Sequence, residues 1–298
     1  MKAGLYNIET NDFIASWDEI ISNGLNVSHN YDDYYEEEPL DGQDLSPAAE
    51  IFDKLNKEDV PLKLVIPGNI ERIGDYVFKE CDNLKEVVIE NGVKEIGDCV
   101  FDECSNLTNI YIPDSVIKIG ECAFICCEGL EHVTLPKNLK EIPNECFSGC
   151  WNLKEISLPD SITRISTNAF SDCGSLENIT IPKNVKIIEN STFYCCEKLK
   201  EITLNEGLQE IEAHAFNDCY ELNTLKIPKS VKYIHESIFG YINIDNKKII
   251  IQNELNKEFM DKFKNNIVYL SLDMLLNEGK SLREISNIYK GNDDSLYR

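Results

Sequence analysis

The stretch LTNIYIPDSVIKIGECAFICCEG, residues 107–129, recurs along most of the chain with the same spacing of apolar residues. Its phenylalanine belongs to a column that has one member every 23 residues, without an insertion. The column consists of Phe78, Phe101, Phe124, Phe147, Phe170, Phe193, Phe216 and Phe239. Self-similarity at a fixed short period is the signature of a repeat architecture, so we expect one continuous repeat body in this part of the chain.

Two apolar columns in each unit lie two residues apart, which is the period of a strand with one buried face. In the quoted unit these positions are Ile110 and Ile112, and Pro113 follows them directly. Proline lacks a backbone donor, so it ends the strand after a few residues. A unit of this size cannot bury its apolar side alone, so neighbouring units must stack. The sequence therefore predicts a repeat solenoid of about eight coils, with short parallel strands roughly 4.8 Å apart.

These units resemble the leucine-rich repeats of the BspA-like type, whose pattern is L-x-x-I-x-I-P-x-x-V-x-x-I-G-x-x-A-F-x-x-C. The resemblance covers about residues 62–240. The glycine of the pattern is kept at Gly74, Gly97 and Gly120 and is replaced in later units, where we expect slightly different turns. The resemblance implies a leucine-rich repeat fold and a binding scaffold rather than a catalyst. Many proteins of this type are surface proteins with secretion signals.

The regions that flank the repeats are predicted to be caps, because the end coils of a solenoid otherwise expose core and strand edges. We expect an acidic helical N-terminal cap over residues 1–60, the solenoid over 61–240 and a C-terminal cap over 241–298. Thr10 is predicted to cap a first helix, and Ser46 a second one. The apolar faces of these helices would carry Phe13, Trp17, Ile20 and Ile21, and then Ile51, Phe52 and Leu55.

The repeat ends where Ile242 and Asp245 occupy the positions of the expected cysteine and leucine. Beyond this point, residues 248–252 and 267–272 are predicted to form strands, with a helix over 256–265 between them. A final pair of helices is expected to follow. This arrangement resembles the β-α-β end cap of related repeat proteins.

The charge of the chain narrows the classes of partner. Its 298 residues include 29 Lys and Arg against 53 Asp and Glu, a net charge of −24. Such a surface is poorly suited to nucleic acids or anionic membranes. No apolar run approaches the roughly 20 residues of a membrane span, and residues 1–17 alternate where a signal peptide would be continuously apolar. We therefore expect a cytoplasmic protein, with the acidic run over residues 31–38 as a solvated loop.

The twelve cysteines are predicted to be free thiols. Seven of them share one interior position of the repeat, where a cytosolic chain keeps thiols reduced. These are Cys81, Cys104, Cys127, Cys150, Cys173, Cys196 and Cys219. A straight file of sulfurs cannot surround a metal ion tetrahedrally, so we expect no metal site. Cys126 and Cys195 lie off this file, either as chance surface cysteines or as reactive thiols.

No catalytic motif is apparent in the sequence. The four histidines lie outside any pattern of nucleophilic catalysis, and phosphate-binding loops, metalloprotease helices and dinucleotide fingerprints are missing. We therefore expect neither an enzyme nor a cofactor.

Residues 279–298, GKSLREISNIYKGNDDSLYR, resemble a helix-turn-helix of recombinases and small regulators. Ser281 and Glu284 form a capping box. Asp293 and Asp294 stand where a base-reading side chain should be, so a helical end cap is favoured over a DNA-binding regulator.

The outward positions of the predicted strands form the candidate binding site. A rigid strand platform loses little entropy when it binds, so we expect it to bind another protein or a peptide. One outward column contains Val88, Tyr111, Thr134, Ser157, Thr180, Thr203 and Lys226. Tyr111, with His132 in the neighbouring outward column, is the predicted anchor because aromatic residues are enriched at hot spots. The alternatives are solvated strand residues without a partner, the DNA-binding regulator, and a surface or host-interaction protein.

Overall fold

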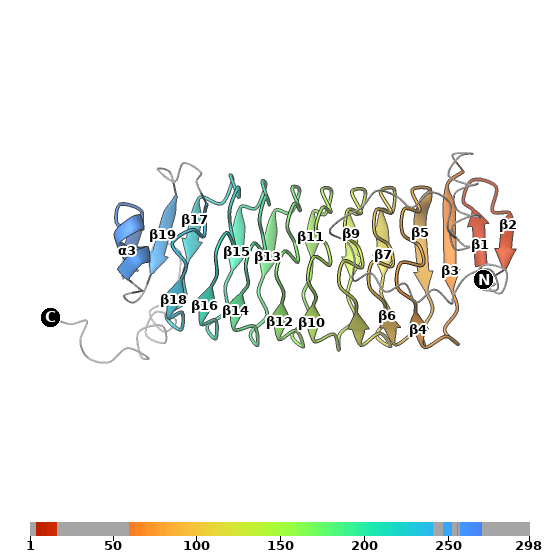
Figure 1. Ribbon diagram of the computed structural model, residues 1–298, viewed down its shortest axis with the longest axis horizontal. Helices are drawn as coiled ribbons and strands as arrows, with labels where there is room; N and C mark the ends of the chain where they lie inside the picture. The colour runs from red at the N-terminus through yellow and green to blue at the C-terminus, as the bar shows by residue number, and fades with distance from the viewer. Residues whose placement is uncertain (1–3, 17–59, 241–246, 252–254, 256, 270–298) are drawn as a thin grey trace, which may run out of the picture.

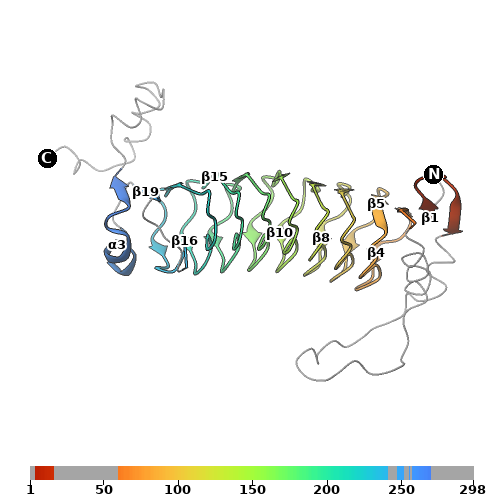
Figure 2. The same cartoon turned by 90° about the horizontal axis from the view of Figure 1, so that it is seen from above.

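Residues 4–16, 60–240, 247–251, 255 and 257–269 are the part of the chain that the computed structural model describes (Figure 1). Within this part, the repeats wind into a solenoid whose coils lie one beside the next along a single long axis (Figures 1 and 2). The predicted repeat solenoid with short parallel strands is therefore confirmed.

Each coil contributes one strand to a parallel row that runs along the solenoid (Figure 1). The strands are β3 (Leu62–Ile66), β5 (Leu84–Ile89), β7 (Asn109–Tyr111), β9 (His132–Thr134), β11 (Glu155–Ile156), β13 (Asn178–Thr180), β15 (Glu201–Thr203) and β17 (Thr224–Lys226). From β3 to β15, adjacent strands pair in a register of one full repeat, as Ile110 does with Val133, whereas β17 pairs with β19 (Lys248–Ile251). Each three-residue strand buries its middle residue and exposes the other two, because successive side chains point to opposite faces.

A second row of strands, each two residues long, contains the isoleucine column of the repeat (Figure 1). Its members are β4 (Arg72–Ile73), β6 (Glu95–Ile96), β8 (Lys118–Ile119), β10 (Glu141–Ile142), β12 (Arg164–Ile165), β14 (Ile187–Ile188), β16 (Glu210–Ile211) and β18 (Tyr233–Ile234). The last residue of each of these strands is an isoleucine, and it is buried. The sequence predicted one strand per coil, because two residues are too few for an alternating pattern to be recognised.

The phenylalanine column forms the centre of the core. All eight rings are at most 2% exposed. From Phe78 to Phe216, successive ring centroids lie 5.4 to 6.0 Å apart, and the ring planes are within 14° of parallel. The last pair, Phe216 and Phe239, is 6.3 Å apart and tilted by 41°. The regular stacking shows that the coils are related by an almost pure translation until the last repeat.

The seven cysteines of the repeat are buried beside this column, as predicted. From Cys104 onwards, each thiol donates a hydrogen bond to the backbone carbonyl of the phenylalanine 26 residues earlier, at 3.0 to 3.2 Å. Burial raises the pKa of Cys127 and Cys150 well above the ordinary thiol value. These thiols therefore act as small apolar groups with one weak donor each, and they link successive coils.

The N-terminal segment corrects one prediction. Residues 10–16 are not helical: β1 (Gly4–Asn7) and β2 (Phe13–Ser16) form an antiparallel hairpin that extends the main sheet beyond β3. The Thr10 hydroxyl accepts a hydrogen bond from the backbone N of Asp12 at 3.3 Å, so it serves the hairpin turn instead of a helix.

The physical reason is the open edge of β3. An exposed first strand presents unpaired backbone groups, and β1 satisfies them with four antiparallel residue pairs. The remaining positions assigned to N-terminal helices, and the acidic run, lie outside the described residues: Trp17, Ile20, Ile21, Ser46, Ile51, Phe52, Leu55 and 31–38.

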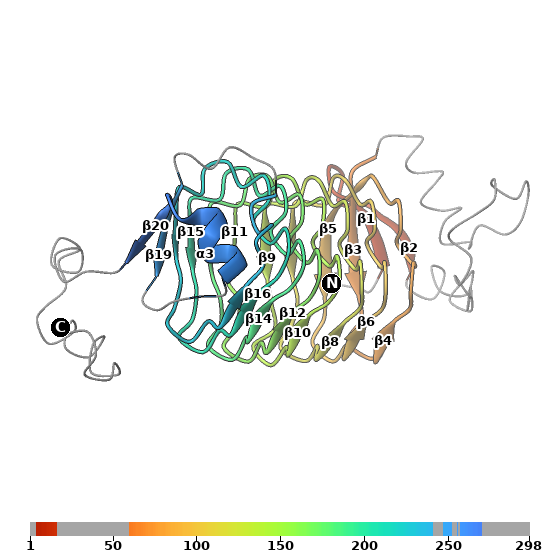
Figure 3. The same ribbon diagram turned by 60° about the vertical axis from the view of Figure 1, so that its left-hand side comes forward.

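The other end of the stack contains β19 (Lys248–Ile251), α3 (Lys257–Phe263) and β20 (Ile267–Tyr269) in the predicted order. Both strands extend the row from β17 in parallel, and α3 covers the end of the core (Figure 3). Phe263 contacts Phe239 edge to face at 5.8 Å, so the aromatic column continues into the helix. The helices predicted after this unit lie outside the described residues.

Candidate functional site

The predicted outward columns all lie on one face of the solenoid, which we call the strand face. It is formed by the outward side chains of the odd-numbered strands from β5 to β17. Of the eight candidate residues, seven are exposed and Val88 is half-buried. The buried residue between each outward pair packs onto the core. The strand face is therefore a row of side chains fixed by the backbone pairing behind them.

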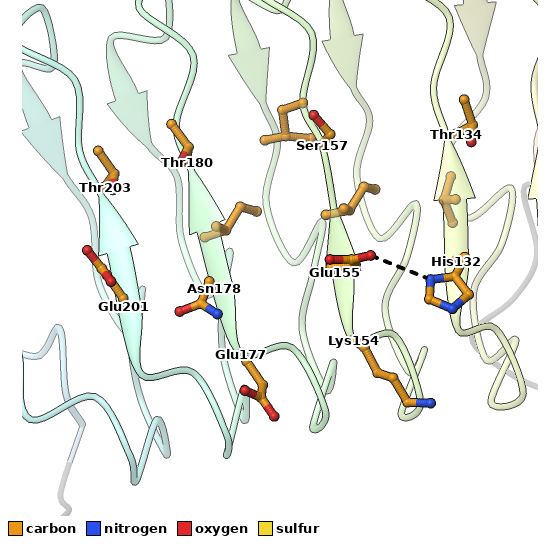
Figure 4. A pocket seen from close by; sticks show the side chains of 14 residues that line it. His132, Thr134, Lys154, Glu155, Ser157, Glu177, Asn178, Thr180, Glu201 and Thr203 are labelled. Carbon is orange, nitrogen blue, oxygen red and sulfur yellow. Dashed lines mark ion pairs between the residues drawn. The ribbon is translucent and has the colours of Figure 1, made fainter.

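A hollow of about 900 Å³ lies on the strand face, across β9, β11, β13 and β15 (Figure 4). Its polar lining consists of His132, Thr134, Lys154, Glu155, Ser157, Glu177, Asn178, Thr180, Glu201 and Thr203. Five of the candidate residues are among them, whereas Val88, Tyr111 and Lys226 lie outside the hollow. Sequence reasoning did not find the hollow, because its position depends on how four coils are placed relative to one another.

Tyr111 and His132, the predicted anchor, are diagonal neighbours on adjacent strands. They lie on the neighbouring strands β7 and β9, but Tyr111 pairs across the sheet with Thr134, and His132 pairs with Asn109. The Tyr111 ring is 58% exposed. Tyr111 therefore lies on β7, next to the strand β9 that begins the polar lining of the hollow.

Lysine side chains at the edge of the hollow are paired between coils. Lys154 Nζ lies 2.6 Å from Glu131 Oε2, and Lys200 Nζ lies 2.9 Å from Glu177 Oε2. The hydrogen bond and the charge of Lys154 lower the pKa of Glu131. The positive charges of Lys154 and Lys200 are thus matched by glutamates of the preceding coil.

Two carboxylates in the hollow are left without such a partner. Within the described residues, no lysine or arginine lies at ion-pair distance from Glu155 or Glu201. Glu155 Oε1 faces only the His132 ring, whose Nδ1 is 4.0 Å away (Figure 4). Asn178 lies on the strand between the two glutamates. Among the described residues, the hollow therefore presents two carboxylates without a lysine or arginine partner, one of them beside His132, among short, neutral hydrogen-bonding groups.

The two off-column cysteines are half-buried. Burial, followed by neighbouring acidic side chains, raises the pKa of Cys126 and raises that of Cys195 to about 11. Because the thiolate is the nucleophile, these shifts disfavour the reactivity considered for them. Cys99 shows the opposite behaviour: a hydrogen bond from Cys122 lowers its pKa. The sequence could have indicated this interaction, because Cys99 and Cys122 occupy the same position in consecutive repeats.

Within the described ranges, no group of three or more His, Cys, Asp or Glu side chains is arranged to hold a metal ion. None of the described helices has the length and apolarity needed to cross a bilayer. The helix-turn-helix-like segment over residues 279–298 lies outside the described residues.

The repeats match a known family. The model of the BspA type leucine-rich repeat region, with six copies, matches residues 59–177 and 163–274. A comparison with curated proteins finds no match.

Solved leucine-rich repeat structures are similar to this chain. One is the leucine-rich repeat protein TpLRR of T. pallidum, with 30% identity and a TM-score of 0.51, covering 54% of this chain and 77% of that one. Another is a leucine rich cell surface protein from Faecalibacterium prausnitzii A2-165, with 26% identity and a TM-score of 0.44, covering 70% of this chain and 63% of that one.

Repeats of this kind are generally non-enzymatic scaffolds that bind other proteins. The two matched ranges contain all eight phenylalanines of the core column. They also contain every strand of the strand face. The chain thus belongs to the BspA type leucine-rich repeat family.

Proposed function

We propose that this protein is a non-catalytic scaffold that binds an extended segment of another protein in the hollow of the strand face. The observation that carries the proposal is the hollow itself, about 900 Å³ across four parallel strands and lined by exposed polar side chains. Repeat solenoids commonly bind their partners on extended concave surfaces.

The rigidity of the lining supports this role. Ser157, Thr180 and Thr203 have short side chains, so little rotamer entropy is lost when they contact a partner. The backbone of Thr180 and Thr203 is held by pairing between their coils, and the buried residues of the strands belong to the core. Binding energy is therefore available for contacts with the partner instead of being used to order the site.

The charges of the hollow define the partner segment. Glu155 and Glu201 attract positive charge, whereas Lys154 and Lys200 are already paired with glutamates. Charge complementarity of this kind mainly sets specificity and the rate of association. The partner segment should therefore carry lysine or arginine residues and lack acidic ones where it crosses the hollow.

The spacing of the two glutamates indicates the conformation of the segment. They lie two strands apart, which is about 10 Å for strands spaced by about 4.8 Å. A polyproline II segment returns to the same face every three residues and advances about 9 Å in doing so. An extended proline-rich segment with a basic residue at every third position therefore matches both carboxylates.

A peptide titration tests this proposal. The probe is a fluorescent proline-rich peptide with lysine at every third position, measured by anisotropy at physiological salt against the same peptide with glutamine. We expect the lysine peptide to bind, and the Glu155→Gln, Glu201→Gln double variant to weaken binding by about tenfold or more.

The matched control is Glu210→Gln, which removes an acid from β16 in the second row of strands. This variant should leave the affinity unchanged. If the double variant and Glu210→Gln lower the affinity equally, attraction by the overall charge of −24 explains the binding, and the hollow is not the site. A chain that binds lysine and glutamine peptides alike would also contradict the proposed partner.

A further inference from the structure

Cys99 and Cys122 occupy the same position in neighbouring coils, away from the strand face. Tyr76 precedes them in this column and Glu145 follows them, each 23 residues from the next. All four have a left-handed backbone, with φ between 51° and 58°. A shared and uncommon backbone conformation gives the side chains of the column the same direction in every coil.

The two coils are held at a distance that suits a disulfide bond. The backbone N of Cys99 donates to the carbonyl of Glu121 at 2.9 Å, which fixes the register at this position. Two residues further on, the rings of Phe101 and Phe124 are 5.4 Å apart and within 13° of parallel. Neighbouring coils are therefore about this far apart, inside the roughly 4.4–6.8 Å between Cα atoms that a disulfide spans, and the two side chains must lean toward each other to bring their Cβ atoms within roughly 3.5–4.5 Å.

The two thiols differ in character, and the Cys122 thiol donates a hydrogen bond to Glu145 Oε2 at 3.7 Å. Hydrogen bonds from the thiol of Cys122 and the hydroxyl of Tyr76 lower the pKa of Cys99. The same contact with Cys99, together with burial, raises the pKa of Cys122. Cys99 is therefore the better nucleophile at neutral pH, and Cys122 is a protonated thiol in position to react second. Both are half-buried, whereas the cysteines of the core column are buried.

We propose that Cys99 and Cys122 form a reversible disulfide between adjacent coils by exchange with a low-molecular-weight disulfide. The Cys99 thiolate attacks one sulfur of that molecule, its sulfur–sulfur bond breaks, and one small thiolate leaves. The Cys122 thiol then gives up its proton and attacks the Cys99 sulfur, which expels the second small thiolate. The two protein thiols are oxidised, the small disulfide is reduced to two thiols, and the two thiol protons pass to them.

The surrounding charges favour a cationic small disulfide. Acidic side chains lie around the pair: Asp102 and Glu145 act on the thiols, and Asp98 lies beside Tyr76 of the same column. The one described cation beside it, Lys79, is paired with Asp102 at 3.1 Å. We therefore expect cystamine, which carries two positive charges, to react faster than the anionic oxidised glutathione.

The experiment uses the full chain in a cystamine and cysteamine buffer, followed by trapping of free thiols with N-ethylmaleimide and mass spectrometry of linked peptides. The expected product has lost two hydrogen atoms and carries one bond, between Cys99 and Cys122. Cys99→Ser is expected to slow the loss of thiols by about tenfold or more. Cys122→Ser should stop at a mixed disulfide on Cys99.

Cys126→Ser is the matched control, because the equivalent position in the next coil is Gly149 and offers no second thiol. This variant should form the bond at the parent rate. A bond between core cysteines, no bond at all, or equal behaviour of the three variants would overturn the proposal. If a variant fails to fold, fragment sequencing of the parent chain still identifies the bonded residues. Neither cysteine lines the hollow, so this result is independent of peptide binding.

Discussion

Truncating one ring in the middle of the phenylalanine column should destabilise the whole solenoid. Phe170 is fully buried and lies between Phe147 at 5.6 Å and Phe193 at 5.7 Å, with ring planes within 8° of parallel. Phe170→Ala removes both contacts and opens a cavity. Core substitutions of this type cost about 3–5 kcal/mol. Phe170→Ala also loses two stacked ring pairs, each contributing about 0.5–1.5 kcal/mol beyond burial. We therefore expect its cost in free energy of unfolding to lie toward the upper end of the range for core substitutions.

The measurement is urea unfolding followed by circular dichroism, with the free energy of unfolding extrapolated to water. Phe239→Ala is the matched control, because this buried ring in the last coil is tilted by 41° from Phe216 at 6.3 Å instead of lying between two parallel rings. It should lose less stability than the mid-column variant. If Phe170→Ala unfolded at the urea concentration of the parent protein, the column would not be the core and the reasoning would be refuted.

Three further outcomes are expected. The lowered pKa of Glu131, measured by NMR titration, should return toward its ordinary value in Lys154→Ala. A carboxylate with a lowered pKa stabilises the fold at pH values above its unfolded pKa, and this stabilisation is lost as the pH falls through the folded pKa. Lys247→Met should lower the free energy of unfolding by about 1–3 kcal/mol, because two buried carbonyls, each 2.8 Å from Lys247 Nζ, lose their donor. Anisotropy with mixed duplexes at physiological salt should show no useful DNA affinity, and micromolar salt-sensitive binding would instead favour the regulator role of residues 279–298.

Much of the interior follows from the sequence because each repeat position has one environment. A residue type that recurs in every coil, such as Phe170 or Cys173, must stack on its own copies, so its burial can be predicted without coordinates. The outward direction of Thr180 and its equivalents follows in the same way from the alternation of a strand. These predictions need only the period and the rule that successive strand residues face opposite ways.

The features that sequence reasoning missed depend on contacts between different parts of the chain. The helix predicted from Thr10 is a hairpin because the open edge of β3 pairs with β1, an interaction between residues about 60 positions apart. The lowered pKa of Cys99 depends on the thiol of Cys122 in the next coil. The lack of a lysine or arginine partner for Glu155 and Glu201 among the described residues depends on which lysines pair with other glutamates.

The most direct test of the proposed scaffold role places a benzophenone amino acid at Thr180, the centre of the hollow, and crosslinks the partner in cells. Tyr233, on β18 in the second row of strands, is the control position. We predict a crosslinked protein at Thr180 and none at Tyr233, with lysine or arginine residues next to the linked position in the partner. Equal capture at both positions, or a linked segment without basic residues, would contradict this function.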